Sequence, residues 1–90
     1  MIFERLIFMI NNKVTVTWVD ALLYHPDTQN KIPSTMRTTG TLVSEEGEYI
    51  IIEDQSTIKI SDGSEYPSGR KPKYFTIPKG FIQKIELAKD

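Results

Sequence analysis

Alternation of apolar and polar residues is the clearest pattern in this chain, and it predicts strands. In residues 13–24, Val14, Val16 and Trp18 alternate with threonines and a further valine. β-Branched and aromatic residues spaced two apart are typical of a strand that buries one face. We therefore predict a first strand over residues 13–24, with Val14, Val16 and Trp18 facing the core and Trp18 as a core anchor.

The middle of the chain predicts two more strands joined by a short acidic turn. Residues 36–44 contain Gly40, and a glycine inside a strand commonly marks a sharp bend or a bulge. Residues 45–47 are expected to form a hairpin turn before a third strand over residues 48–54. The near-continuous apolar run in this strand predicts burial on both faces, or one face in the core and one in a subunit contact. Residues 56–60 could form a further short strand.

The C-terminal third predicts two strands that flank a Pro-Lys-Gly step. Residues 73–77 and 81–87 are short and rich in apolar residues, and the step between them predicts a very tight turn. Small β-barrels often close with such a pair. Period-two spacing predicts two faces for the last strand: Phe81, Gln83, Ile85 and Leu87 on one, and Ile82, Lys84 and Glu86 on the other.

Two polar stretches that contain prolines predict loops, over residues 25–33 and 61–72. The whole pattern amounts to about five strands and no convincing long helix. Short strands with glycine-driven bends favour a small closed barrel over a sandwich. We therefore predict an all-β fold, a small five-stranded barrel.

The apolar N-terminal stretch is too short to cross a membrane. Residues 1–10 fall well below the ~20 residues that a membrane span needs, and Glu4 and Arg5 interrupt them. The stretch also lacks the small-residue cleavage site of a secretory signal, so no membrane association is predicted. Two alternatives stay open. Residues 1–12 form a short arm or helix that packs on a barrel domain over residues 13–90, or translation starts at Met9 instead of Met1.

Composition narrows the possible functions. Ninety residues make one domain with a modest core. The absence of cysteine removes disulfides, thiolate zinc sites and a cysteine nucleophile, and it fits a reducing cytoplasm. The net charge of −1 argues against a strongly basic binder of polyanions. Acidic residues crowd the middle of the chain and basic residues the C-terminal third: Glu45, Glu46, Glu48, Glu53 and Asp54 against Arg70, Lys71, Lys73, Lys79 and Lys84.

Catalytic and metal-binding patterns are weak in this sequence. His25 is the single histidine. A metal site normally needs three or four convergent ligands, and a serine nucleophile needs a positioned base. One hypothesis is a hydrolase with an active site built around His25. The simpler interpretation is that His25 is an ordinary loop histidine. We predict no enzymatic activity, no cofactor and no metal.

The order of features resembles the Sm-like family. Its first motif has alternating apolar residues on strand one, then a glycine two residues before an apolar residue on strand two, then a third strand. Here Val14, Val16 and Trp18 precede Gly40-Thr41-Leu42 and the strand around Ile50. Its second motif, an apolar residue, a basic residue and a glycine, is matched by Ile77-Pro78-Lys79-Gly80. The similarity spans roughly residues 13–87.

More specifically, the chain resembles small bacteriophage-encoded Sm-like proteins of unknown function. The shared features are a valine–Trp–Val-Asp-Ala first strand, a Thr-x-Gly-x-Leu second strand and an Ile-Pro-Lys-Gly ending. The resemblance implies an SH3-type barrel that joins edge to edge into a homo-oligomeric ring, in the host cytoplasm if phage-encoded. The expected interface residues are Ile50, Ile51, Ile52, Phe75 and Ile77.

Two functions compete for such a ring. Cations beside an aromatic residue suit RNA or single-stranded DNA, and the candidate contacts are Lys79, Gly80, Arg70, Lys71, Lys73 and Tyr74. The plain alternatives are a solvated turn and a charged loop tip. RNA-binding relatives usually carry an Asp and an Asn between strands two and three, whereas residues 44–48 hold three glutamates and no Asn. These carboxylates would repel phosphate, and Lys79 stands where relatives have arginine. The second hypothesis is therefore a structural or protein-interaction module without a nucleic-acid role.

Overall fold

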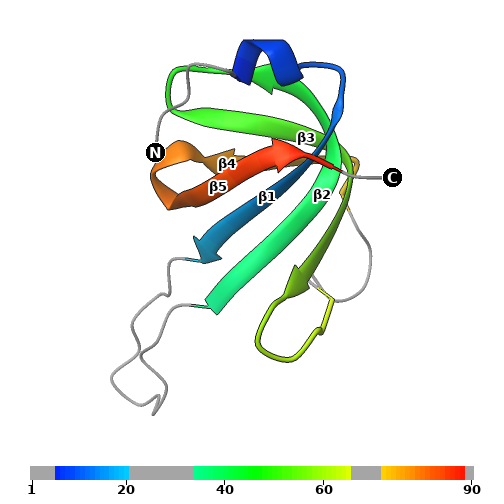
Figure 1. Ribbon diagram of the computed structural model, residues 1–90, viewed down its shortest axis with the longest axis vertical. Coiled ribbons are helices and arrows are strands. Elements are labelled where there is room, and N and C mark those ends of the chain that lie inside the picture. Colours follow the sequence, from blue (N-terminus) through cyan, green and yellow to red (C-terminus); the bar gives the residue numbers. More distant parts are fainter. Residues whose placement is uncertain (1–5, 21–33, 66–71, 89–90) are drawn as a thin grey trace.

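Five antiparallel strands in a single sheet make up the computed structural model, which describes residues 6–20, 34–65 and 72–88. The strand order is β4-β3-β2-β1-β5 (Figure 1). The strands are β1 (Lys13–Asp20), β2 (Ser34–Glu45), β3 (Tyr49–Lys59), β4 (Tyr74–Pro78) and β5 (Ile82–Leu87), with the 3-10 helices η1 (Leu6–Met9) and η2 (Lys79–Phe81). The predicted all-β class is confirmed. The expected loop over residues 25–33 and the end of the first predicted strand lie outside the described residues.

The alternation predicted for β1 is confirmed. Val14, Val16 and Trp18 are buried, and the threonines between them face outward. Because successive side chains of a strand point to opposite faces, this alternation places one face of the sheet on the core. Among the described residues, ten buried apolar side chains form that core: Leu6, Val14, Val16, Trp18, Met36, Leu42, Ile50, Ile52, Ile77 and Ile82.

A bulge next to Gly40 joins two predicted strands into one. Thr39 pairs with Ser56 and Thr41 pairs with Glu53. Two residues of β3 therefore lie opposite the single residue Gly40 of β2. Asp54 takes a positive φ of 52° at this point. The predicted strands over residues 48–54 and 56–60 are therefore a single strand, β3, which bends at its bulge. The bend predicted at Gly40 is confirmed, although the extra residue belongs to β3.

The C-terminal strands are confirmed, but they do not pair with each other. η2 makes the predicted tight turn, and the chain then crosses from one edge of the sheet to the other. β4 pairs with β3, whereas β5 pairs with β1. The expected closing pair is therefore absent from the described strands, and the sheet is unclosed. In Figure 1, β4 and β5 leave the same turn as separate edge strands.

The predicted faces of β5 are confirmed from Lys84 to Leu87, but the face predicted for Ile82 is wrong. Ile82 is buried and lies opposite Trp18, while Ile85 is half-buried and lies opposite Val16. Both therefore face the core, although they are three residues apart. The register shifts between Thr17 and Trp18, so that β5 accommodates one extra residue there. This irregularity reverses the alternation that simple period-two spacing predicts.

The residues before β1 pack on the sheet. Leu6 is buried in the core and Met9 and Ile10 are partly buried against it. Backbone hydrogen bonds hold this segment: the Asn11 N–H donates to the Leu42 carbonyl at 2.6 Å, and the Leu42 N–H donates to the Asn12 carbonyl at 3.0 Å. In Figure 1, η1 covers one end of the curved sheet. No helix within the described ranges is long and apolar enough to span a membrane.

Candidate functional site

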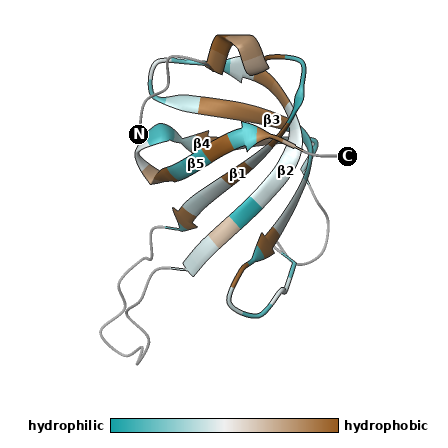
Figure 2. Ribbon diagram, in the orientation of Figure 1, coloured by the Kyte–Doolittle hydropathy of each residue, from teal (hydrophilic) through white to brown (hydrophobic). Residues whose placement is uncertain are grey.

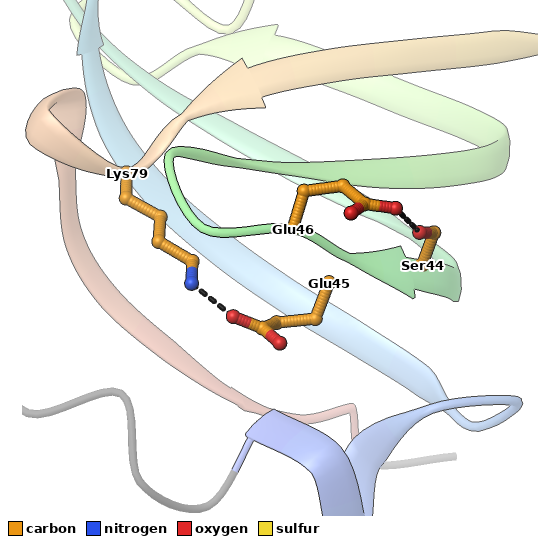
Figure 3. A network of polar contacts seen from close by, with 4 residues as sticks. All are labelled: Ser44, Glu45, Glu46 and Lys79. Atoms are coloured by element: carbon orange, nitrogen blue, oxygen red, sulfur yellow. Dashed lines mark hydrogen bonds and ion pairs between the residues drawn. The ribbon is translucent and has the colours of Figure 1, made fainter.

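Lys79, the central residue of the predicted nucleic-acid site, is engaged by the acidic loop opposite. Its ammonium Nζ forms an ion pair and hydrogen bond with Oε1 of Glu45, at the end of β2 (Figure 3). Its backbone N–H donates to the Glu48 carbonyl at 2.8 Å. The Lys79 side chain is only 13% exposed and that of Glu45 30%. A phosphate group would have to displace a partly buried carboxylate to reach this ammonium.

The loop between β2 and β3 carries two further glutamates, Glu46 and Glu48. The Ser44 hydroxyl donates to Glu46 Oε1 at 2.8 Å, and the Glu46 N–H donates to the Tyr49 carbonyl at 2.8 Å. The second contact confirms the predicted hairpin turn. Glu46 and Glu48 are exposed. In Figure 3 the Glu45 carboxylate faces Lys79, whereas that of Glu46 turns toward Ser44. The acidic residues of this loop disfavour a polyanion at this end of the sheet.

The structure does not require a glycine at position 80. A Cβ built on it would meet no atom within 4 Å. Its φ lies outside the left-handed region, where Gly63 is the one glycine of the described residues. The turn is instead formed by Pro78 in extended conformation and by the Ile82 N–H, which donates to the Lys79 carbonyl. Position 80 therefore needs neither the backbone conformations that only glycine adopts readily nor the close contact that a missing side chain allows.

The second predicted cluster lies at the other end of β4. Lys73 Nζ is 3.8 Å from Glu53 Oε1 and 5.5 Å from the centre of the Tyr74 ring. Tyr74 is more than half exposed. Five residues along a strand separate Tyr74 from Lys79 by about 16 Å. Arg70 and Lys71 lie outside the described residues. The structure thus brings Lys73 and Tyr74 together, but it does not join them with Lys79 and Gly80 into one site.

The predicted interface residues divide into buried and half-buried groups. Ile50, Ile52 and Ile77 are 0–1% exposed and belong to the core. Ile51 is half-buried, as is Phe75, whose ring packs 5.7 Å from that of Trp18. The three core side chains cannot contact another subunit. Any strand-to-strand contact at this edge must therefore use the backbone of β4 and its exposed side chains.

A chain of buried polar groups was not predicted from the sequence. The Trp18 Nε1–H donates to the Thr38 hydroxyl at 2.8 Å, and the Thr38 and Thr57 hydroxyls are 2.6 Å apart. The Thr57 hydroxyl donates to Gln55 Oε1. All four residues are at most 4% exposed. The one sequence signal for this buried threonine is its spacing: Thr38 lies two residues after Met36 on β2, so both side chains point to the same face of the sheet.

Within the ranges that the structure describes, no three His, Asp or Glu side chains gather as metal ligands would. His25 lies outside those ranges. Comparisons with protein-family models, with curated proteins and with solved structures find no match for this chain.

Proposed function

We propose that this chain is a non-enzymatic, Sm-like subunit that assembles head to tail into a closed ring. One observation carries the proposal: β4 and β5 are the two edges of one unclosed sheet, each with a single neighbour among the described strands. The Sm-like order of motifs in the sequence is the second support, because that family joins its subunits through edge strands.

Free edges expose rows of backbone donors and acceptors that pair readily with another strand. β4 has five residues and β5 has six, so one can cover the other along most of its length. Contact between two different edges is heterologous, and heterologous contacts generate rings when the rotation closes. Exposed apolar side chains lie on both edges, Tyr74 on β4 and Leu87 on β5, each 54% exposed. An edge-to-edge contact would place them near a neighbouring subunit.

The charge arrangement supports one of the two roles of such a ring. The Lys79–Glu45 pair and the exposed Glu46 and Glu48 favour a structural or protein-interaction ring over one that holds RNA at this turn. A nucleic-acid role for Lys73 and Tyr74 with Arg70 and Lys71 remains a prediction. In a bacteriophage setting, the ring would act in the host cytoplasm.

Light scattering on the purified chain tests the assembly. A ring gives one peak with a mass that is a multiple, above two, of 10.3 kDa. The ratio of absorbance at the nucleic-acid and protein maxima on the same peak separates the two roles. A monomer over the full accessible concentration range would refute the ring.

Blocking one edge at a time tests the head-to-tail contact. Thr76 on β4 and Gln83 on β5 are exposed, and lysine on an edge strand is a natural block to pairing. Thr76→Lys and Gln83→Lys should each give monomers, whereas their mixture should give a heterodimer from the two unblocked edges. Ser56→Lys, exposed on the interior strand β3, is the matched control and should still form rings. A dimer formed by either edge variant alone would show a like-to-like contact instead.

A further inference from the structure

A hollow on the outer face of the sheet carries a second arrangement of cations. It has a volume of about 430 Å³ and lies over β1, β2 and β5, on the face opposite the core. Its lining consists of Thr15, Thr17, Arg37, Lys84, Glu86 and Leu87. Because the hollow is built within one chain, it does not depend on the proposed ring.

The strand register places two cations on either side of one hydroxyl. Thr17 lies directly opposite Arg37 on β2 and directly opposite Lys84 on β5. The two basic residues are thus two strand spacings apart at the backbone, about 10 Å. Cross-strand neighbours on one face are within reach of each other's side chains. Both long side chains can therefore converge on a group seated above Thr17.

Arg37 is the main reason to expect a ligand here. Its side chain is exposed and makes no hydrogen bond or ion pair with any residue that the structure describes. Its planar fork of donors matches the oxygens of a phosphate group. In contrast, Lys79 is paired with Glu45 and shielded. Among these cations, Arg37 offers the donors that a phosphate needs without first breaking an ion pair.

The remaining lining groups refine the site. Lys84 has a loose ion pair with Glu86, at 3.6 Å and with both side chains more than half exposed. Such a pair is worth little and is readily exchanged. The Thr15 and Thr39 hydroxyls lie 3.5 Å apart in the next cross-strand row and offer further donors. The Glu86 carboxylate, on the residue paired with Thr15, would repel an anion. Arg37, Lys84 and Glu86 together give the hollow a net charge of +1.

We propose that this hollow binds a phosphate group through the Arg37 guanidinium, the Lys84 ammonium and the Thr17 hydroxyl. Two sources share this chemistry: free inorganic phosphate and the backbone of a single-stranded nucleic acid. None of the lining side chains is aromatic, so the hollow offers no platform for stacking bases. Recognition is therefore of the phosphate and not of the base.

NMR titration of the isotope-labelled full chain tests the site at constant ionic strength. Inorganic phosphate and a short oligothymidylate are added in separate experiments. The expected result is a saturable shift of the amide signals of Thr17, Arg37 and Lys84. Tighter binding of the oligonucleotide, which weakens when the titration is repeated at a higher ionic strength, identifies the nucleic-acid backbone as the source. Equal or weaker binding identifies free phosphate. Failure of both probes to saturate these signals would overturn the proposal.

Variants that change the charge of the lining residues test whether these residues determine the affinity for phosphate. Arg37→Gln should weaken binding about tenfold, since a hydrogen bond to a charged group is lost. Arg37→Lys should weaken it less, because it keeps the charge and loses the fork. Glu86→Gln should tighten binding, an effect that a merely structural role for this face would not produce. Lys59→Gln is the control: Lys59 lies opposite Met36, on the core-facing side, and the variant should bind normally.

Two outcomes count against the site even if a ligand binds. Unchanged affinity in Arg37→Gln would overturn it, as would oligonucleotide affinity that depends on Lys73 and not on Arg37. The ring is assessed separately, because Arg37→Gln should leave the mass measured by light scattering unchanged. If the unmodified chain forms the ring but binds no phosphate, only the phosphate site has failed. If the unmodified chain is a monomer that binds phosphate, only the ring has failed.

Discussion

Gly40 and Ile52 lie so close together that no side chain fits between them. A Cβ on Gly40 would sit 2.5 Å from Cγ2 of Ile52 and 2.8 Å from the backbone carbonyl oxygen of Glu53. The bulge at Asp54 brings this part of β3 against β2. Glycine is required here for close approach and not for an unusual φ, which explains why it interrupts a strand of threonines. In Figure 2, β2 is mostly pale because threonines and serines dominate it.

Gly40→Ala should lower the free energy of unfolding by about 2–3 kcal/mol, the typical cost of overpacking a well-filled site. One of the clashing atoms belongs to the backbone of β3, so rotation of a side chain cannot relieve the strain. Chemical denaturation followed by Trp18 fluorescence measures the change. Gly47→Ala is the matched control, because a Cβ at Gly47 meets nothing within 4 Å. Equal stability of the two variants would contradict the close approach.

Thr38→Val should destabilise the fold by about 1–3 kcal/mol although it preserves side-chain shape. The change removes the acceptor of the Trp18 Nε1–H and a partner of the Thr57 hydroxyl, and buried polar groups without partners are costly. Thr39→Val is the control, since Thr39 is half-buried and its hydroxyl lies 3.5 Å from that of Thr15. Denaturant midpoints of both variants provide the test. A Thr38 variant as stable as the Thr39 variant would show that the polar chain adds nothing.

Leu6→Ala should lower the free energy of unfolding by about 2 kcal/mol, at the lower end for a buried leucine, because Leu6 belongs to the short helix η1 and not to a strand of the sheet. Leu6 is 2% exposed and belongs to the core. Phe8→Ala should be nearly neutral, because Phe8 is 78% exposed. A chain that begins at Met9 loses Leu6 and should match Leu6→Ala in thermal unfolding. Full stability of that shorter chain would show that the arm contributes little to the fold.

The Lys79–Glu45 pair should show a coupling of about 1 kcal/mol in a double-mutant cycle. The variants are Lys79→Met, Glu45→Gln and the two combined, with unfolding free energies measured for each. Partial burial reduces solvent screening of this pair, so it should exceed the loose Lys73–Glu53 pair, which is 3.8 Å apart and has a Lys73 side chain 65% exposed. The same cycle on Lys73 and Glu53 should give coupling near zero. Equal values for the two pairs would argue against a structural role for Lys79.

Asp62 should titrate below the ordinary range of an aspartate. The Ser64 hydroxyl, followed by the Ser64 backbone N–H, donates to this carboxylate and lowers its pKa. Since the folded-state pKa is lowered, the contribution to stability is present above the ordinary pKa of aspartate and is lost as pH falls through the lowered value. Ser64→Ala should raise the pKa of Asp62 in a carboxyl NMR titration, whereas Ser61→Ala should not. No movement in Ser64→Ala would assign the shift to another cause.

Local pattern predicted the strands well where alternation is unbroken. Val14, Val16 and Trp18 face the core as predicted, and the acidic turn lies where the polar residues indicated. The sequence also shows the candidate basic residues, but it does not show which residues they contact. Lys79 pairs with Glu45, 34 residues earlier, and no local signal distinguishes a paired lysine from a solvated one.

The sequence by itself determined the all-β class, most strand positions, the tight turn and the need for a bend at Gly40, because these depend on neighbouring residues. Tertiary structure alone decided which strands pair and where alternation breaks. The extra residues at Asp54 on β3 and opposite Thr17 on β5 reverse the parity of everything beyond them. β4 and β5 become opposite edges because β3 and β1 provide their ladders. The row of Arg37, Thr17 and Lys84 likewise exists only through register, which brings together residues that are far apart in the chain.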